Sequence, residues 1–339
     1  MGVMKVVVTG ATGNAGTSVI HALAADPKVS DVTGVARRLP GHRVDGMRWE
    51  AADVAPGGSD LDRLFRGADA VVHLAWKFQP THDPLETWQT NVLGSVRVFE
   101  ACARSGVPAL VHASSVGAYS PGPKDGRPVD ESWPTHGWPA AAYTREKAYL
   151  ERYLDGFERA NPQMRVVRMR PGFLFKRASA SEQRRIFAGP LLPWWLVRPG
   201  LLPVVPGIRG LRFQALHTDD AAEAYRCAVL RPVRGPFNLV ADPVLDSASL
   251  ARMRHARTIP LPAGAARAAL AAAWRLHLVP AAPGLLDAVL RLPLLDAGRA
   301  REELGWTPSR TSTEAFEEFL VGLGDGAGLD TAPLAAARH

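Results

Sequence analysis

The 339-residue sequence has few of the features that mark secreted, disulfide-rich or membrane-spanning proteins. It has two cysteines, Cys102 and Cys227, which lie far apart and form neither a CxxC pair nor a disulfide framework. No apolar run reaches the roughly 18 residues of a membrane-spanning helix. The first expected strand begins so close to Met1 that it leaves no room for a signal peptide. These absences favour a reduced, cytoplasmic protein with no membrane partner.

Charge and metal-binding residues are also dispersed. The net charge is +7, but no long basic run with interleaved aromatic residues occurs, so nucleic acid is not an expected partner. No cluster of His, Cys, Asp or Glu has the spacing of metal ligands, and we expect no metal. A mild basic excess suits a phosphorylated or otherwise anionic small molecule equally well.

Short apolar runs alternate along the chain with helix-length segments. This alternation predicts parallel βαβ units, and therefore an α/β fold of the Rossmann type with a doubly wound parallel sheet. Long helices are expected at residues 84–105 and 140–160. Strands are expected at residues 5–9, 29–36, 51–54, 69–75, 109–115 and 165–170.

A glycine-rich loop joins the first expected strand to the first expected helix. Glycines allow a tight turn and a close approach of the backbone to phosphate, and a helix N-terminus offers free N–H groups. Such a loop between a buried strand and a helix predicts a dinucleotide site. The candidate binding residues in it are Gly10, Thr12, Gly13, Asn14, Ala15 and Gly16.

The residues after the second and third strands bear on the identity of the dinucleotide. An acidic residue ~20 positions past the loop would select NAD, but this chain has Arg37 and Arg38 there. A guanidinium pairs well with a 2′-phosphate, so NADP is favoured, with NAD as the alternative if the two arginines are only solvated. Asp53, at the end of the third strand, is a candidate acceptor for the adenine amine or a turn-capping carboxylate.

Composition changes after Pro171, where proline, leucine, tryptophan and glycine become frequent. We expect residues 1–171 to form the NAD(P)-binding domain, with residues 211–242 returning to it. Residues 172–210 and 243–322 should form a smaller, mostly helical C-terminal substrate domain, and residues 323–339 a flexible tail.

Tyr143 and Lys147 stand four residues apart in a predicted helix, so their side chains share one face. A free tyrosine has a pKa of roughly 10, and a nearby ammonium favours the phenolate and moves this pKa toward neutrality. Ser115, at the carboxyl end of the fifth strand, is placed to hydrogen-bond a substrate oxygen, and Asn91 to support a proton relay. Each feature is common alone, but together they predict a proton-transfer site.

In their order along the chain, these motifs resemble the extended short-chain dehydrogenase/reductase family, also called the NAD-dependent epimerase/dehydratase family. The resemblance rests on the glycine loop, Asp53-Val54, Val71-Val72-His73-Leu74-Ala75, Asn91-Val92-Leu93-Gly94, His112-Ala113-Ser114-Ser115, Tyr143 with Lys147, Arg170-Pro171-Gly172, His217-Thr218-Asp219-Asp220, Phe237-Asn238-Leu239 and Leu304-Gly305-Trp306-Thr307-Pro308.

The resemblance implies a catalytic triad of Ser115, Tyr143 and Lys147, with hydride transfer to or from a nicotinamide. It also implies a homodimer that pairs through the helices at 84–105 and 140–160. Cofactor contacts are implied at Val54, Leu74, Ala75, Tyr143, Lys147 and Pro171.

Two departures from the family pattern leave alternatives open. Asn14 and Ala15 replace the usual larger residues of the loop, as in NmrA-like relatives, some of which sense cofactors without catalysis. Phe173 stands where nucleotide-sugar members commonly carry Asn. We expect an NAD(P)-dependent oxidoreductase acting on a carbonyl/alcohol pair. The alternatives are a nucleotide-sugar 4-epimerase or dehydratase with retained NAD(P), and a non-catalytic NADP-binding regulator.

Residues 186–205 are rich in large apolar side chains, and in this family the segment walls the substrate pocket. Such a wall suits an apolar or aromatic small-molecule substrate, with Arg198, Arg209 and Arg212 available for an anion. Alternatively, the tryptophans only pack the small domain. The apolar residues are Ile186, Phe187, Leu191, Leu192, Trp194, Trp195, Leu196, Val197, Leu201 and Leu202.

Overall fold

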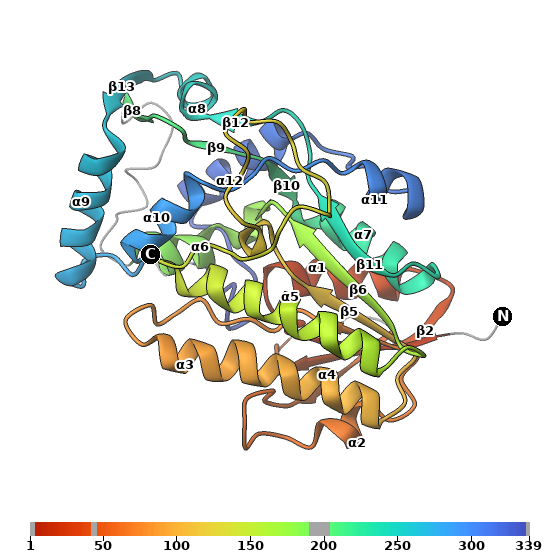
Figure 1. The fold of residues 1–339 in the computed structure, drawn as a ribbon. Coiled ribbons are helices and arrows are strands. Elements are labelled where there is room, and N and C mark those ends of the chain that lie inside the picture. The colour runs from red at the N-terminus through yellow and green to blue at the C-terminus, as the bar shows by residue number, and fades with distance from the viewer. Residues whose placement is uncertain (1–3, 42–45, 190–203, 337–339) are drawn as a thin grey trace.

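A computed structural model describes residues 4–41, 46–189 and 204–336 (Figure 1). Its centre is a sheet of seven parallel strands: β1 (Met4–Thr9), β2 (Val29–Ala36), β3 (Met47–Ala51), β4 (Ala70–His73), β5 (Ala109–Ala113), β6 (Arg165–Pro171) and β11 (Gly235–Leu239). The strand order is β11-β6-β5-β4-β1-β2-β3. β2 and β3 are added on one side of β1, and β4, β5 and β6 on the other, so the order of winding switches between β1 and β4. The predicted Rossmann-type, doubly wound fold is therefore confirmed.

The central strands are buried on both faces because helices cover both. Val6 and Val8 of β1 belong to a core that includes residues of α1 (Asn14–Ala24) and α7 (Thr218–Leu230). Val7 points the other way, into a core shared with α2 (Leu61–Phe65), α4 (Gly94–Arg104) and α5 (Ala142–Ala160). Successive strand residues face opposite sides, so one apolar run supplies both cores.

The predicted helix at 84–105 is present, but it is interrupted. It begins as α3 (Pro84–Trp88), whose N-cap Asp83 accepts hydrogen bonds from the N–H groups of Leu85 and Glu86. A π-helical turn, η1 (Gln89–Leu93), follows, and α4 continues the helix. Figure 1 shows α3 and α4 running beside α5. Such π-helical turns recur at functional sites, and this one contains the fully buried Asn91.

Three two-stranded sheets lie outside the central sheet. They pair β7 (Phe173–Phe175) with β10 (Ala215–His217), β9 (Arg212–Phe213) with β12 (Leu245–Asp246), and β8 (Val204–Ile208) with β13 (Arg257–Leu261). Residues 211–242 therefore return to the central sheet only through β11, because β11 occupies the free edge of β6 from Val167 to Pro171. The expectation that residues 212–216 rejoin that sheet is wrong.

The remaining elements are helices and short helical turns. They are η2 (Val116–Ala118), η3 (Arg177–Ser179), α6 (Ala180–Gln183), η4 (Arg184–Ala188), α8 (Ser247–Met253), α9 (Ala263–Arg275), α10 (Pro283–Val289), α11 (Gly298–Glu303) and α12 (Ser312–Asp325). Within the described ranges, no helix has the length and apolarity needed to cross a bilayer.

The C-terminal segment differs from the expected flexible tail. Helix α12 continues to Asp325 and ends at Gly326, whose φ of 61° is left-handed. The chain then folds back, and the side chains of Thr331 and Leu334 are 3% and 0% exposed. Thr331 and Leu334 are therefore held in buried positions, whereas Ala332, Ala335 and Ala336 are exposed.

Candidate functional site

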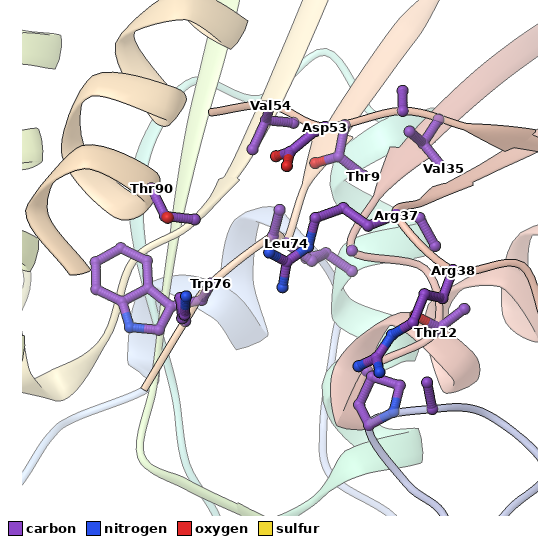
Figure 2. Close-up of a pocket in the computed structure, with 18 of the residues that line it drawn as sticks. Thr9, Thr12, Val35, Arg37, Arg38, Asp53, Val54, Leu74, Trp76 and Thr90 are labelled. Atoms are coloured by element: carbon purple, nitrogen blue, oxygen red, sulfur yellow. The ribbon is translucent and has the colours of Figure 1, made fainter. Parts of the chain in front are cut away.

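A cleft lies at the carboxyl edge of β1, β2, β3 and β4, where the strand order reverses (Figure 2). We call it the first cleft. Its volume, open solvent included, is about 790 Å³. Of the predicted cofactor residues, Gly10, Thr12, Gly13, Arg37, Arg38, Asp53, Val54, Leu74 and Ala75 line it. Thr9, Trp76, Lys77, Thr90, Glu182, Ala332 and Pro333 line it too, and none of these was predicted.

The glycine loop is shaped for a close approach of its backbone to a ligand. Gly10 has a φ of 73°, and a Cβ atom there would lie 2.6 Å from the backbone nitrogen of Ala75. A Cβ atom on Gly16 would overlap the carbonyl oxygen of Gly10, so α1 packs tightly on the loop. At Gly13 the nearest atom to such a Cβ is 3.5 Å away.

The N-terminus of α1 has no side-chain cap. Its first N–H groups are therefore available to a phosphate, with the positive end of the helix dipole behind them. This open backbone cradle fits the pyrophosphate of a dinucleotide.

Six predicted cofactor residues are not among those that line the first cleft: Asn14, Ala15, Gly16, Tyr143, Lys147 and Pro171. The Asn14 amide instead donates to the carbonyl oxygen of Leu174 at 3.2 Å. Its side-chain oxygen accepts from the Thr218 hydroxyl at 3.1 Å. Asn14 thus joins the glycine loop to the C-terminal half of the chain.

The two arginines and Asp53 lie at neighbouring strand ends. Figure 2 shows the guanidinium groups of Arg37 and Arg38 on the cleft side of the loop after β2. The carboxylate of Asp53 accepts from the N–H of Ala55 at 3.0 Å. Asp53 therefore caps its own turn and also lines the cleft, and its contact with adenine stays a prediction.

Ser115 and Tyr143 are brought together, as the sequence predicts. The Ser115 hydroxyl accepts from the N–H of Gly117 at 3.0 Å and begins the short helix η2. A Cβ atom on Gly117 would lie 2.7 Å from Cε1 of Tyr143, which shows how closely this turn packs on the ring. Glycine at this position lets the Tyr143 phenol approach the Ser115 hydroxyl.

Lys147 shares the face of α5 that carries Tyr143, but it does not act on the Tyr143 pKa as expected. Its ammonium donates to the carbonyl oxygen of Ala113 at 2.7 Å and lies 3.4 Å from the centroid of the Trp76 ring. The distance to the Tyr143 ring centroid is 5.9 Å. Lys147 therefore contacts Trp76 more closely than it contacts Tyr143.

The pKa values of the pair follow from this arrangement. Burial raises the pKa of Tyr143 to about 12, although the Ser115 hydroxyl opposes the rise. Burial also lowers the pKa of Lys147 to about 7, against the charges of Glu146 and Glu151. The expected lowering of the Tyr143 pKa is therefore wrong for this state of the protein, since Lys147 is turned toward Trp76 and is itself easily deprotonated.

Asn91 lies in η1 and holds the loop that follows β4. Its side-chain oxygen accepts from the N–H of Lys77 at 2.7 Å, and its amide donates to the Lys77 carbonyl oxygen at 2.8 Å. The amide also donates to Glu146 at 2.7 Å, and Glu146 accepts from the Thr87 hydroxyl at 2.6 Å. Sequence reasoning missed Glu146, although it directly precedes Lys147. Its burial raises its pKa.

A second cleft, lined in part by Tyr143, has an open volume of about 900 Å³. Trp76 and Lys77 line both clefts, so the two meet at these residues, and Tyr143 lines only the second. The ring of Phe78 stacks on that of Tyr143 with centroids 5.1 Å apart, and Trp76 meets it edge-on at 5.6 Å. The residues that line this second cleft include Trp76, Phe78, Tyr143, Arg145, Glu146, Arg267 and Trp274.

The cations of the second cleft are already engaged. Lys77 pairs with Glu86, and Arg267 pairs with Asp287 at 2.8 Å. Arg145 donates to the carbonyl oxygen of Pro139 at 2.5 Å. An anionic ligand would have to compete with these partners.

Only part of the predicted substrate wall can be compared with this cleft. Leu191, Leu192, Trp194 to Arg198, Leu201 and Leu202 lie outside the described residues. Phe187 meets Phe78 edge-on at 5.9 Å, and the carbonyl oxygen of Ile186 accepts from Gln79 at 2.6 Å. Phe173 packs against Phe213 at 5.4 Å and is not among the residues that line the second cleft.

A doubly wound sheet with a glycine loop at its switch point, together with a Tyr–Lys pair on an adjoining helix, defines a short-chain dehydrogenase/reductase. The family model described as NAD dependent epimerase/dehydratase family matches residues 6–239, and the chain belongs to this family. It is therefore an NAD(P)-dependent enzyme of the short-chain dehydrogenase/reductase type.

Related sequences include an uncharacterized protein of Mycobacterium tuberculosis, which is 25% identical over 94% of this chain and 84% of its own length. The UDP-glucose 4-epimerase of Neisseria meningitidis serogroup C is 25% identical over 66% of this chain and 73% of its own. The L-arabinose 1-dehydrogenase (NAD(P)(+)) of Haloferax volcanii is 32% identical over 33% of this chain and 41% of its own.

Solved structures share the fold. UDP-N-acetylglucosamine 4-epimerase from Methanobrevibacter ruminantium superposes with a TM-score of 0.72 at 18% identity, covering 95% of this chain and 98% of that one. The UDP-glucose 4-epimerase of Thermus thermophilus, in complex with NAD, gives a TM-score of 0.69 at 20% identity, covering 94% of this chain and 99% of that one.

Proposed function

We propose that this enzyme transfers a hydride at an alcohol or carbonyl carbon of a sugar bound in the second cleft, with 4-epimerisation of a nucleotide sugar as the first candidate. The observation that carries the proposal is the meeting of the two clefts beside Tyr143. The similarity to UDP-sugar 4-epimerases in sequence and fold supports the substrate class. Retention of the dinucleotide through each turnover belongs to this proposal.

Several residues would hold the dinucleotide. The glycine loop and the uncapped first turn of α1 would hold the pyrophosphate, and Asp53 lines the first cleft at the expected adenine end. Arg37 and Arg38 support NADP, because a guanidinium pairs strongly with a 2′-phosphate. The nicotinamide, when bound, accepts and returns the hydride.

The chain itself supplies the proton chemistry. At neutral pH Tyr143 is a protonated phenol, since burial raises its pKa to about 12, and it is ready to donate to a carbonyl oxygen. The Ser115 hydroxyl is placed to hydrogen-bond the same oxygen. For the reverse step the phenol must lose its proton, and Lys147 would favour the phenolate if its ammonium, which here lies over Trp76, turned toward Tyr143. Asn91 and Glu146 keep the loop with Lys77 in place.

A second candidate is an NADP-dependent reductase for an apolar or aromatic carbonyl compound. The aromatic lining of the second cleft favours it, as do the engaged cations Lys77, Arg145 and Arg267, which leave a diphosphate no free partner among them. Phe173, which replaces the Asn of nucleotide-sugar members, weakens the first candidate without lining the cleft itself.

Cofactor exchange separates the two candidates. The purified protein would be denatured to identify any bound dinucleotide, and then assayed with UDP-glucose and with aromatic aldehydes plus NADPH. The first candidate predicts formation of the 4-epimer of UDP-glucose with no net change in nicotinamide absorbance. Oxidation of one NADPH for each aldehyde reduced, with no epimer, would replace it with the second candidate.

A homodimer and a cytoplasmic location remain predictions. Leu93, at the start of the α4 segment, and Tyr149 of α5 are 41% and 44% exposed, which is consistent with helices that pair with a second copy. Size-exclusion chromatography with light scattering checks the dimer, and Tyr149→Glu should weaken it.

A further inference from the structure

The first cleft has one wall that comes from the far end of the chain. Residues 327–336, which we call the strap, follow α12 and fold back onto the glycine loop. Ala332 and Pro333 of the strap line the first cleft together with Thr12, Arg37 and Arg38. A segment more than 300 positions from the glycine loop thus shares the same ligand-sized space.

The strap is fastened at several points. The Thr331 hydroxyl donates to the carbonyl oxygen of Thr12 at 2.9 Å, which ties the strap directly to the glycine loop. The guanidinium of Arg185 donates to the carbonyl oxygens of Pro333 and Ala335, both at 2.7 Å. Leu334 is fully buried. These contacts stabilise one conformation of a segment that has no helix or strand of its own.

The chemistry of the strap suits a cover rather than a charged anchor. Where it lines the cleft it presents Ala332 and Pro333, which carry no charge, while the cations come from the loop after β2. These two residues place apolar surface beside the cations, and charge pairing with a phosphate is stronger where water is excluded.

We infer that the strap retains the dinucleotide in the first cleft, and that Thr331 and Leu334 are positioning residues for this retention. The inference rests on the proposed placement of the dinucleotide in that cleft. Opening the cleft on the strap side requires breaking the contacts of Thr331, Leu334 and Arg185. An enzyme that regenerates its cofactor in each turnover gains from slow release, whereas a reductase must exchange it.

Displacement kinetics test the strap without any substrate. Protein loaded with fluorescent NADPH or NADH is mixed with excess oxidised dinucleotide, and the release rate is followed. Deletion of residues 327–339 should raise the dissociation rate constant by about tenfold or more while the association rate changes little, since affinity differences between related complexes lie mostly in dissociation. Leu334→Ala and Thr331→Val should accelerate release in the same direction. Leu276→Ala, at a residue 68% exposed after α9, should leave it unchanged.

The outcomes are distinguishable. If the wild-type protein binds the dinucleotide and the deletion variant releases it at the wild-type rate, the inference that the strap retains the dinucleotide is wrong, while the proposed function stands. If the wild-type protein binds no dinucleotide, the proposed placement of the cofactor in the first cleft is wrong, and the inference about the strap falls with it. Should the deletion variant not fold, the two point variants decide the matter. Faster release from Leu334→Ala and Thr331→Val than from Leu276→Ala supports the strap, and release at the rate of Leu276→Ala refutes it.

Discussion

The two clefts that meet beside Tyr143 are built in different ways. The first cleft lies at the ends of four adjacent strands, and most of its lining lies in the first 77 residues. The second cleft is made of aromatic and charged side chains from the loop after β4, α5, α9 and α10. A phosphate site of backbone N–H groups depends on a short local pattern, whereas a side-chain pocket depends on how distant segments pack. The difference explains why the family resemblance predicts the cofactor far better than the substrate.

Tyr143→Phe should cause the largest loss of activity. It should slow the reaction without weakening the binding of the dinucleotide. Without the phenolic proton, kcat should fall roughly 1,000-fold, within the range expected for loss of a general acid–base. The dissociation constant of the dinucleotide should stay within about twofold, because the ring and its stacking on Phe78 are kept. Steady-state kinetics and fluorescence titration measure the two. An unchanged kcat would remove Tyr143 from the reaction.

Glu151→Gln should cause the largest loss of stability, because Glu151 fastens α5 to the sheet beneath both clefts. It is 1% exposed, and it accepts from the guanidiniums of Arg170 at 2.7 Å and Arg168 at 3.0 Å and from the Ser114 hydroxyl at 2.5 Å. Removing one partner of a buried ion pair costs about 3 kcal/mol or more. Urea unfolding should show this loss, while Glu303→Gln, in an exposed pair with Arg299, should cost less than about 1 kcal/mol.

The same carboxylate predicts an acid-sensitive step. Burial alone would raise the pKa of Glu151, but Arg170 and then Arg168 hold it at about 2. A folded-state pKa below that of the unfolded chain adds stability that is complete above the unfolded pKa and is lost as the pH falls toward 2. The free energy of unfolding of wild type should therefore decline across this window, and that of Glu151→Gln should decline less. Parallel slopes would contradict the assignment.

Gly10→Ala should weaken the binding of the dinucleotide in the first cleft. The new Cβ would lie 2.6 Å from the Ala75 nitrogen at a φ of 73°, so the loop must shift. Backbone strain of about 2 kcal/mol weakens dinucleotide binding roughly 30-fold. Gly67→Ala is the matched control, since Gly67 has a φ of 74° with no atom within 4 Å of its Cβ. Equal effects of the two on dinucleotide affinity would show that φ strain, rather than close approach, is responsible.

Replacing Arg37 and Arg38 together by Ser should give the smallest change in dinucleotide affinity. The result decides between NADP and NAD as the cofactor. Loss of charged hydrogen bonds to a 2′-phosphate should weaken NADP binding by about tenfold and leave NAD binding unchanged. Isothermal titration with both dinucleotides measures this, with Arg159→Ser on the exposed end of α5 as control. A stronger preference of wild type for NAD would refute the argument from the two arginines.

The sequence predicts the fold and the first cleft well because the signals are local. Buried valine runs, the glycine loop and strand-end residues such as Asp53 and Leu74 all sit within a few positions of the elements that place them. It also predicts that Ser115 approaches Tyr143, because both follow from the family pattern.

What the sequence could not predict depends on contacts between distant segments. The role of Trp76 follows from its packing on Lys147 and Tyr143, which no spacing encodes. The same holds for the pairing of β10 with β7 and for Pro333 in the first cleft. The raised pKa of Tyr143 depends on burial, which a pair of residues four apart cannot reveal.

The most direct test of the account is a crystal structure of the protein with NADP bound. The account predicts the pyrophosphate at the glycine loop and the first turn of α1, the adenosine end beside Arg37 and Arg38, and the nicotinamide at the junction of the two clefts near Tyr143 and Lys147. A nicotinamide placed away from Tyr143, or a dinucleotide bound in the second cleft, would contradict it.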